Sequence, residues 1–274
     1  MFGIDPLLIV GLLLLGCCTG FLAGLLGIGG GMLMVPFMTM LFTAQHFDTR
    51  LIVHMAIATS LATILFTSAS SVRAHHQRGA VRWDIFKKLA PLAFVGTIVG
   101  AQFAGQLKTP YLALFFGLFV GYSAIKMLAS KASVVAKAMP STPAVAGIGG
   151  AIGVVSSLVG AGGGFITVPF LSSRGVPMHH AVATSAAMGF PIAAGGLIGY
   201  IVAGWSVAGL PAGAWGYVYM PALLGCAVTS ILFAPIGAKS AHNLPVATLK
   251  RVFAGLLIAL ACYMLYKSYT AFTS

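Results

Sequence analysis

The chain has 274 residues, of which 59% are hydrophobic and only 7% are charged, whereas about 25% of the residues of a typical soluble domain are charged. Apolar runs of about 18 residues or more recur along it, which excludes a soluble globular domain and predicts an all-α polytopic membrane protein. The runs are too continuous for the roughly ten-residue alternating strands of an outer-membrane barrel. The formal charge of +12 lies in short loops, so we expect a lipid bilayer and no nucleic acid as partner.

Each half of the chain contains five apolar segments, the second of which is short. Residues 32–42 would form a helix of about 16 Å, roughly half the hydrocarbon thickness. We therefore expect about eight conventional spans and two half-helices that enter the membrane and return; the alternative is that the short pieces span. The segments are predicted at Pro6–Leu26, Met32–Phe42, Leu51–Ser71, Leu89–Leu107, Tyr111–Leu128, Ala144–Val159, Phe165–Leu171, Ala181–Ile201, Tyr217–Pro235 and Leu249–Ser268.

The two sets of segments divide the chain into repeats. Residues 129–143 contain no long apolar run and are predicted as a cytoplasmic linker. The first membrane repeat is expected over residues 1–128 and the second over residues 144–274. A repeat of this length indicates a duplicated membrane bundle rather than a solenoid.

A glycine-rich stretch precedes each short segment. Gly27–Pro36 and Gly160–Pro169 align at a constant offset of 133 residues. Glycine weakens a helix by roughly 1 kcal/mol relative to alanine, and a broken backbone at membrane depth is tolerable where it faces protein or a wet cavity. The helix that restarts would direct free N–H groups and its positive dipole end into that cavity. The predicted anion-binding glycines are Gly29, Gly30, Gly31, Gly162, Gly163 and Gly164. The alternative is close helix packing through small residues.

Hydroxyl pairs recur in the segment after each short one. Thr59 and Ser60 in the first half correspond to Thr184 and Ser185 in the second. Hydroxyl groups there can donate to an oxyanion without adding charge, and we include all four in the predicted site. The alternative is that they bond to carbonyl groups of their own helices, as serine and threonine often do.

Two further polar residues are predicted to contribute to the site. His54 lies in an apolar run five residues before Thr59, where an imidazole can take up and release a proton during transport. A proton is therefore one coupling ion to consider; the alternative is an interfacial histidine. Gln102 lies in an otherwise apolar helix and is expected to face the cavity.

The distribution of basic residues predicts the topology. The loop Arg73–Lys88 is rich in arginine and lysine and is expected in the cytoplasm. Counting crossings from this loop places both termini outside, together with Arg50, Lys108 and Lys267. Each half then makes an odd number of net crossings, so the repeats are inverted, and a substrate site is expected near the midplane between them.

Several classes of site are absent from the sequence. The acidic residues are Asp5, Asp48 and Asp84, none of them deep in a predicted span, and there is no glutamate. Paired carboxylates, a zinc-protease motif and a nucleophile elbow are missing, so we expect no enzyme, no metal and no cofactor. The four cysteines lie in apolar segments without metal-ligand spacing. Because no predicted span contains a carboxylate deep inside it, nothing there would pair with a cationic substrate. The sequence therefore favours an anionic substrate.

The motifs resemble those of the TauE/SafE family, the sulfite and organosulfonate exporters. The resemblance implies a bacterial or archaeal inner-membrane protein of about eight spans, with the glycines and hydroxyl pairs above at its site. It implies secondary transport, here by alternating access, of small sulfur-containing anions such as sulfite or sulfonates. A passive channel of the same architecture and a carrier of a different organic anion are the alternatives; direction, coupling ion and oligomeric state are open. The motifs are Gly20–Gly31 with Val35-Pro36, the copy ending at Val168-Pro169, Ala58-Thr59-Ser60 and Ala183-Thr184-Ser185.

Overall fold

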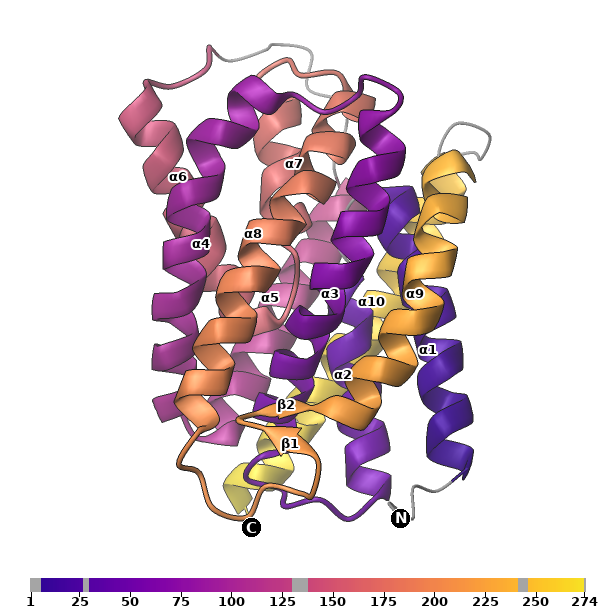
Figure 1. The fold of residues 1–274 in the computed structure, drawn as a ribbon, viewed down its shortest axis with the longest axis vertical. Helices are drawn as coiled ribbons and strands as arrows, with labels where there is room; N and C mark the ends of the chain where they lie inside the picture. Colours follow the sequence, from indigo (N-terminus) through magenta and orange to yellow (C-terminus); the bar gives the residue numbers. More distant parts are fainter. Residues whose placement is uncertain (1–5, 27–29, 130–137, 241–245, 274) are drawn as a thin grey trace.

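The structure is a bundle of helices that run nearly along its long axis (Figure 1). It is a computed structural model, and it describes residues 6–26, 30–129, 138–240 and 246–273. The all-α polytopic class is confirmed for this part of the chain. Its elements are α1 (Pro6–Leu26), α2 (Gly31–Ala44), α3 (Ile52–His76), α4 (Trp83–Gln106), α5 (Thr109–Ala129), α6 (Thr142–Val159), α7 (Gly164–Ser173), α8 (Met178–Gly204), β1 (Ala214–Trp215), β2 (Val218–Tyr219), α9 (Met220–Ser240) and α10 (Val246–Thr273).

Within the described residues, eight helices are long and apolar enough to cross a membrane, as predicted. The apolar helices α2 and α7 have 14 and 10 residues, or about 21 and 15 Å, against a hydrocarbon core of about 30 Å. Figure 1 shows α2 in the lower half of the bundle and α7 in the upper half. Each short helix therefore occupies about one half of the bundle's length.

The predicted segment ends need correction where helices extend beyond their apolar part. Helix α4 begins at Trp83 instead of Leu89, because its first turns carry charged residues that an apolar run does not include. The predicted segment 217–235 is wrong at its start. Residues 218–219 instead form β2, which pairs antiparallel with β1, and the helix begins at Met220 with Pro221 in its first turn, a position that suits proline.

Helices from the two halves pack crosswise. Helix α1 lies along α9, and α6 lies along α4, while α5 packs on α10 and α3 on α8. Helix α3 is the most enclosed of the candidate spans, because 83% of its apolar window is buried. The start of α1 and the end of α10 lie at one end of the bundle, and the α3–α4 connection lies at the other (Figure 1).

Glycines form the contacts between the crosswise pairs. A Cβ added at Gly20 of α1 would lie 2.6 Å from the carbonyl oxygen of Ser230 in α9. The corresponding Gly153 of α6 contacts the carbonyl group of Ala93 in α4 in the same way. Small residues at such positions let backbones approach closely, which drives helix association in lipid. Gly20, the first residue of the Gly20–Gly31 motif, therefore packs closely against another helix.

Candidate functional site

Each short helix is preceded by a glycine with a left-handed backbone. Gly30 precedes α2 with φ 66°, and Gly163 precedes α7 with φ 76°. Gly160, which ends α6, has φ 66°. Residues with a side chain rarely adopt this conformation, so the breaks depend on glycine. Gly29, the first residue of the predicted site, lies outside the described residues.

The two glycine-rich stretches meet inside the bundle. The backbone of Gly31 at the start of α2 contacts the carbonyl oxygen of Gly160, and a Cβ added there would also lie 2.9 Å from Cα of Ala161. The hydroxyl of Ser60 in α3 donates to the same Gly160 carbonyl at 2.8 Å. The start of α2, the end of α6 and the middle of α3 therefore converge on one buried point.

The glycines at the start of α7 are also buried. Gly162, Gly163 and Gly164 are all enclosed by protein. A Cβ at Gly163 would meet side chains of Ile152 and Ile192, so this residue packs against α6 and α8. The N–H groups of Ile166 and Thr167 donate to the Gly163 carbonyl, so in the first turn of α7 the N–H groups of Gly164 and Phe165 are the ones without an intrahelical acceptor.

The threonines of the predicted site accept hydrogen bonds from other elements. The Thr59 hydroxyl oxygen accepts from the backbone N–H of Tyr219 at 3.0 Å, and that of Thr184 accepts from the N–H of Arg82 at 3.0 Å. Tyr219 immediately precedes α9, and Arg82 immediately precedes α4. The two threonines therefore hold corresponding connections, a role that neither sequence-based interpretation included.

His54 and Gln102 lie at contacts between helices. Nε2 of His54 lies 3.2 Å from the carbonyl oxygen of Ala104 and 2.9 Å from that of Leu107, at the end of α4. Because both neighbours are acceptors, the tautomer with its proton on Nε2 satisfies them. The amide of Gln102 donates to the Gly199 carbonyl at 2.8 Å and joins α4 to α8. Each side chain is thus engaged by backbone carbonyl groups.

A small cavity, to which four hydroxyl-bearing residues contribute, lies beside Ser185. Its volume is about 10 Å³, close to the minimum for one water molecule. The hydroxyl of Ser71 is buried and has no hydrogen-bond partner among the described residues, while that of Thr67 bonds to Ser230 at 2.7 Å. The lining residues are Ala23, Thr67, Ser68, Ser71, Ser185, Ala186 and Gly189.

The sequence contained a signal for this cavity that the prediction did not use. Thr59, Thr63, Thr67 and Ser71 follow one another at intervals of four residues in α3, and such residues share one face of a helix. All four are at most 3% exposed. This hydroxyl stripe runs from the level of the glycine contact toward the α3–α4 connection.

The corresponding face of α8 is apolar. At the offset of 125 residues that relates Thr59 to Thr184, Thr67 corresponds to Ile192 and Ser71 to Gly196. The two halves therefore differ in polarity at this place, although their helices pack alike.

Aromatic rings close the core toward the opposite end. Phe42 of α2 lies 5.3 Å from Phe47, and Tyr219 lies 5.6 and 5.2 Å from these two rings, measured between centroids. Both contacts of Tyr219 are edge-on, a favourable geometry for aromatic pairs. The interior thus carries a row of hydroxyl groups toward the α3–α4 connection and a cluster of aromatic rings near β2.

The acidic residues that the structure describes lie away from the glycine contact. Asp48 pairs with Arg50 at 2.7 Å, and Asp84 pairs with Arg82 at 2.7 Å. Hydrogen bonds from Arg50 lower the pKa of the Asp48 carboxyl group below its usual value. No carboxylate from the described part of the chain thus competes for an anion in the interior.

Comparison with known proteins identifies extensive similarity. The family model described as "Sulfite exporter TauE/SafE" matches residues 12–264. A Haemophilus influenzae protein described as a probable membrane transporter is 39% identical over 258 residues, which cover 93% of this chain and 97% of that protein. Proteins with the same description from Methanocaldococcus jannaschii and Xylella fastidiosa are each 28% identical, over 95% and 93% of this chain and 95% and 94% of their own lengths. No solved structure matches.

Proposed function

Because this chain belongs to the sulfite exporter TauE/SafE family, we propose that it exports a small sulfur-containing anion, such as sulfite or an organosulfonate, across the inner membrane. Its family and its relatives identify it as a membrane transporter and not an enzyme. The observation that carries the proposed substrate class is the buried contact between the two glycine-rich stretches, at the start of α2.

The chemistry of this contact suits an oxyanion. The first two N–H groups of α2 and of α7, which precede those that donate to Gly30 and Gly163, would provide donors, and the positive ends of the helix dipoles favour negative charge. Glycine at position 31 lets the start of α2 approach the end of α6 closely, because it has no side chain. The Ser60 hydroxyl, which donates to Gly160 at 2.8 Å, would complete the shell of a bound sulfite or sulfonate group by turning toward it.

The hydroxyl stripe of α3 supports a path to this site. In the proposed cycle the anion enters from the end with the α3–α4 connection and passes Ser71 and Thr67. The aromatic rings near β2 form the opposite gate. The crosswise packing of α1 on α9 and α6 on α4 supports two inverted repeats that rock against each other, as in alternating access.

The test is transport by purified protein in proteoliposomes. We expect saturable counterflow of radiolabelled sulfite that unlabelled sulfonates inhibit and potassium chloride does not. Single-channel currents carried by sulfite in a planar bilayer would instead establish the passive channel. Counterflow of a carboxylate without competition by sulfite would contradict the sulfur-anion assignment while leaving the transporter class intact.

A further inference from the structure

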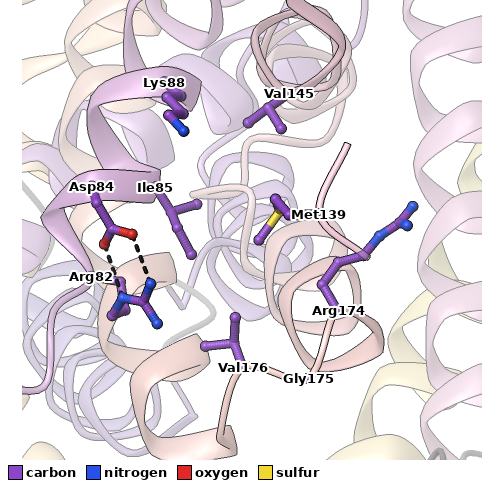
Figure 2. Close-up of a pocket in the computed structure, with 9 residues that line it drawn as sticks. All are labelled: Arg82, Asp84, Ile85, Lys88, Met139, Val145, Arg174, Gly175 and Val176. Atoms are coloured by element: carbon purple, nitrogen blue, oxygen red, sulfur yellow. Dashed lines mark hydrogen bonds and ion pairs between the residues drawn. The ribbon is translucent and has the colours of Figure 1, made fainter. Parts of the chain in front are cut away.

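A cavity lies at the end of the bundle that carries the α3–α4 connection, away from the glycine contact. It has a volume of about 370 Å³ and opens where the starts of α4 and α6 meet the α7–α8 connection. This volume is in the range of small-ligand pockets. Figure 2 shows Lys88 and Arg82 extending from one side toward the space that Val176 and Met139 border on the other.

The cavity carries an excess of positive charge. Its basic lining residues are Arg82, Lys88 and Arg174, and its acidic one is Asp84. Asp84 already accepts two hydrogen bonds from Arg82, at 2.9 and 2.7 Å. Among the lining residues, the charges of Lys88 and Arg174 are therefore left without a carboxylate.

Arg174 retains hydrogen-bonding capacity. Its Nη1 donates to the Ala138 carbonyl at 2.8 Å, and its guanidinium lies 5.5 Å above the ring of Phe170. Its Nε is buried and has no hydrogen-bond partner in the described part of the chain. Figure 2 shows this guanidinium directed away from Lys88, so Lys88 and Arg82 are the basic side chains that reach the cavity.

Four further lining residues are apolar, and two of them belong to the first turns of candidate spans. Ile85, Met139, Val145 and Val176 contribute hydrocarbon surface to the cavity. Ile85 and Val145 belong to the first turns of α4 and α6, and both helices are candidate spans. A ligand that matches this lining combines an anionic group with an apolar part.

We propose that this cavity binds the phosphate group of an anionic phospholipid. The parts of the acyl chains nearest the glycerol would lie against the apolar wall. Basic pockets between transmembrane helices at the membrane surface bind such headgroups. The first turn of α6 contains no acidic residue, so the positive end of its dipole adds to the attraction. Because Gly175 and Val176 follow α7 and Arg82 precedes α4, the bound headgroup ties the segment after α7 to the start of α4 and stabilises the transporter.

The test is thermal unfolding of the purified protein in neutral detergent, titrated with phosphatidylglycerol or phosphatidylcholine. A ligand of the folded state raises the unfolding temperature. We expect a saturable rise with phosphatidylglycerol only, and about fivefold weaker apparent affinity in Lys88→Gln, because it removes one surface cation. Lys87→Gln is the matched control, since Lys87 does not line the cavity, and it should behave as the wild type.

Asp84→Asn provides a variant with the opposite expected sign. It frees Arg82 from its carboxylate, so the affinity for phosphatidylglycerol should rise. A variant that merely folds poorly would not bind the lipid more tightly. Equal effects of the two lipids, or a wild-type response in Lys88→Gln, would overturn the proposal. An equal shift with millimolar sodium phosphate would overturn the lipid assignment and identify a soluble phosphate as the ligand.

Discussion

At the residue scale, the carbonyl oxygen of Gly160 in the second half of the chain contacts two residues of the first half. It accepts from the Ser60 hydroxyl, and the backbone of Gly31 lies directly against it. The Gly160 carbonyl oxygen leaves no room for a Cβ at Gly31. A backbone carbonyl group cannot rotate away from an added methyl group as a side chain can. The geometry of α2 relative to α6 is therefore sensitive to one methyl group.

Gly31→Ala is expected to reduce sulfite counterflow by about tenfold or more, since overpacking a tight site costs about 1–3 kcal/mol. The control is Gly255→Ala in α10, where an added Cβ meets nothing within 4 Å. Counterflow in proteoliposomes measures both variants. Wild-type transport by Gly31→Ala would show that the close contact is not part of the site.

Ser71 allows transport and stability to be separated. Its hydroxyl is buried without a partner among the described residues, so Ser71→Ala should leave the unfolding temperature unchanged or higher, because an unsatisfied polar group is removed. If the hydroxyl contacts the passing anion, the KM for counterflow should rise about fivefold, the loss of one hydrogen bond. Ser70→Ala alters a neighbour outside the cavity and should leave KM unchanged; an unchanged KM in Ser71→Ala would exclude this path.

His54 is expected to position the end of α4 rather than to carry a proton. His54→Gln keeps an N–H donor for the carbonyl groups of Ala104 and Leu107. We expect a lower unfolding temperature and an unchanged pH profile of counterflow. A flattened pH profile, measured between pH 5.5 and 8, would instead assign proton coupling to this imidazole.

At the element scale, the pairing of α6 with α4 depends on glycine. Gly153 lies against the Ala93 carbonyl group, whereas a Cβ at Gly147, on the same helix, would meet nothing within 4 Å. Gly153→Ala should destabilise the protein by about 1–3 kcal/mol through overpacking, and Gly147→Ala should be neutral or slightly stabilising because alanine favours helix. Thermal unfolding in detergent compares them; equal unfolding temperatures would show that α6 and α4 adjust freely.

At the scale of the whole molecule, the bundle has two chemically different ends. The α3–α4 connection carries basic residues, and the opposite end carries the start of α1 and the end of α10 (Figure 1). The predicted orientation places the basic end in the cytoplasm. Gln77→Cys should react with an impermeant thiol reagent only in permeabilised cells, and Thr273→Cys should react in intact cells, with the wild type as background. The reverse pattern would invert the proposed direction of entry.

The sequence by itself determined the eight long helices, the two short ones and the glycine breaks before them, because apolar length and glycine runs are local properties of the chain. It also pointed to Ser60 as a residue of the interior. Only the tertiary structure decided what these residues contact. The Thr59 hydroxyl binds the N–H of Tyr219, and Gly31 meets Gly160, residues far apart in the chain. Such pairs arise from helix packing, which depends on the shapes of both surfaces at once.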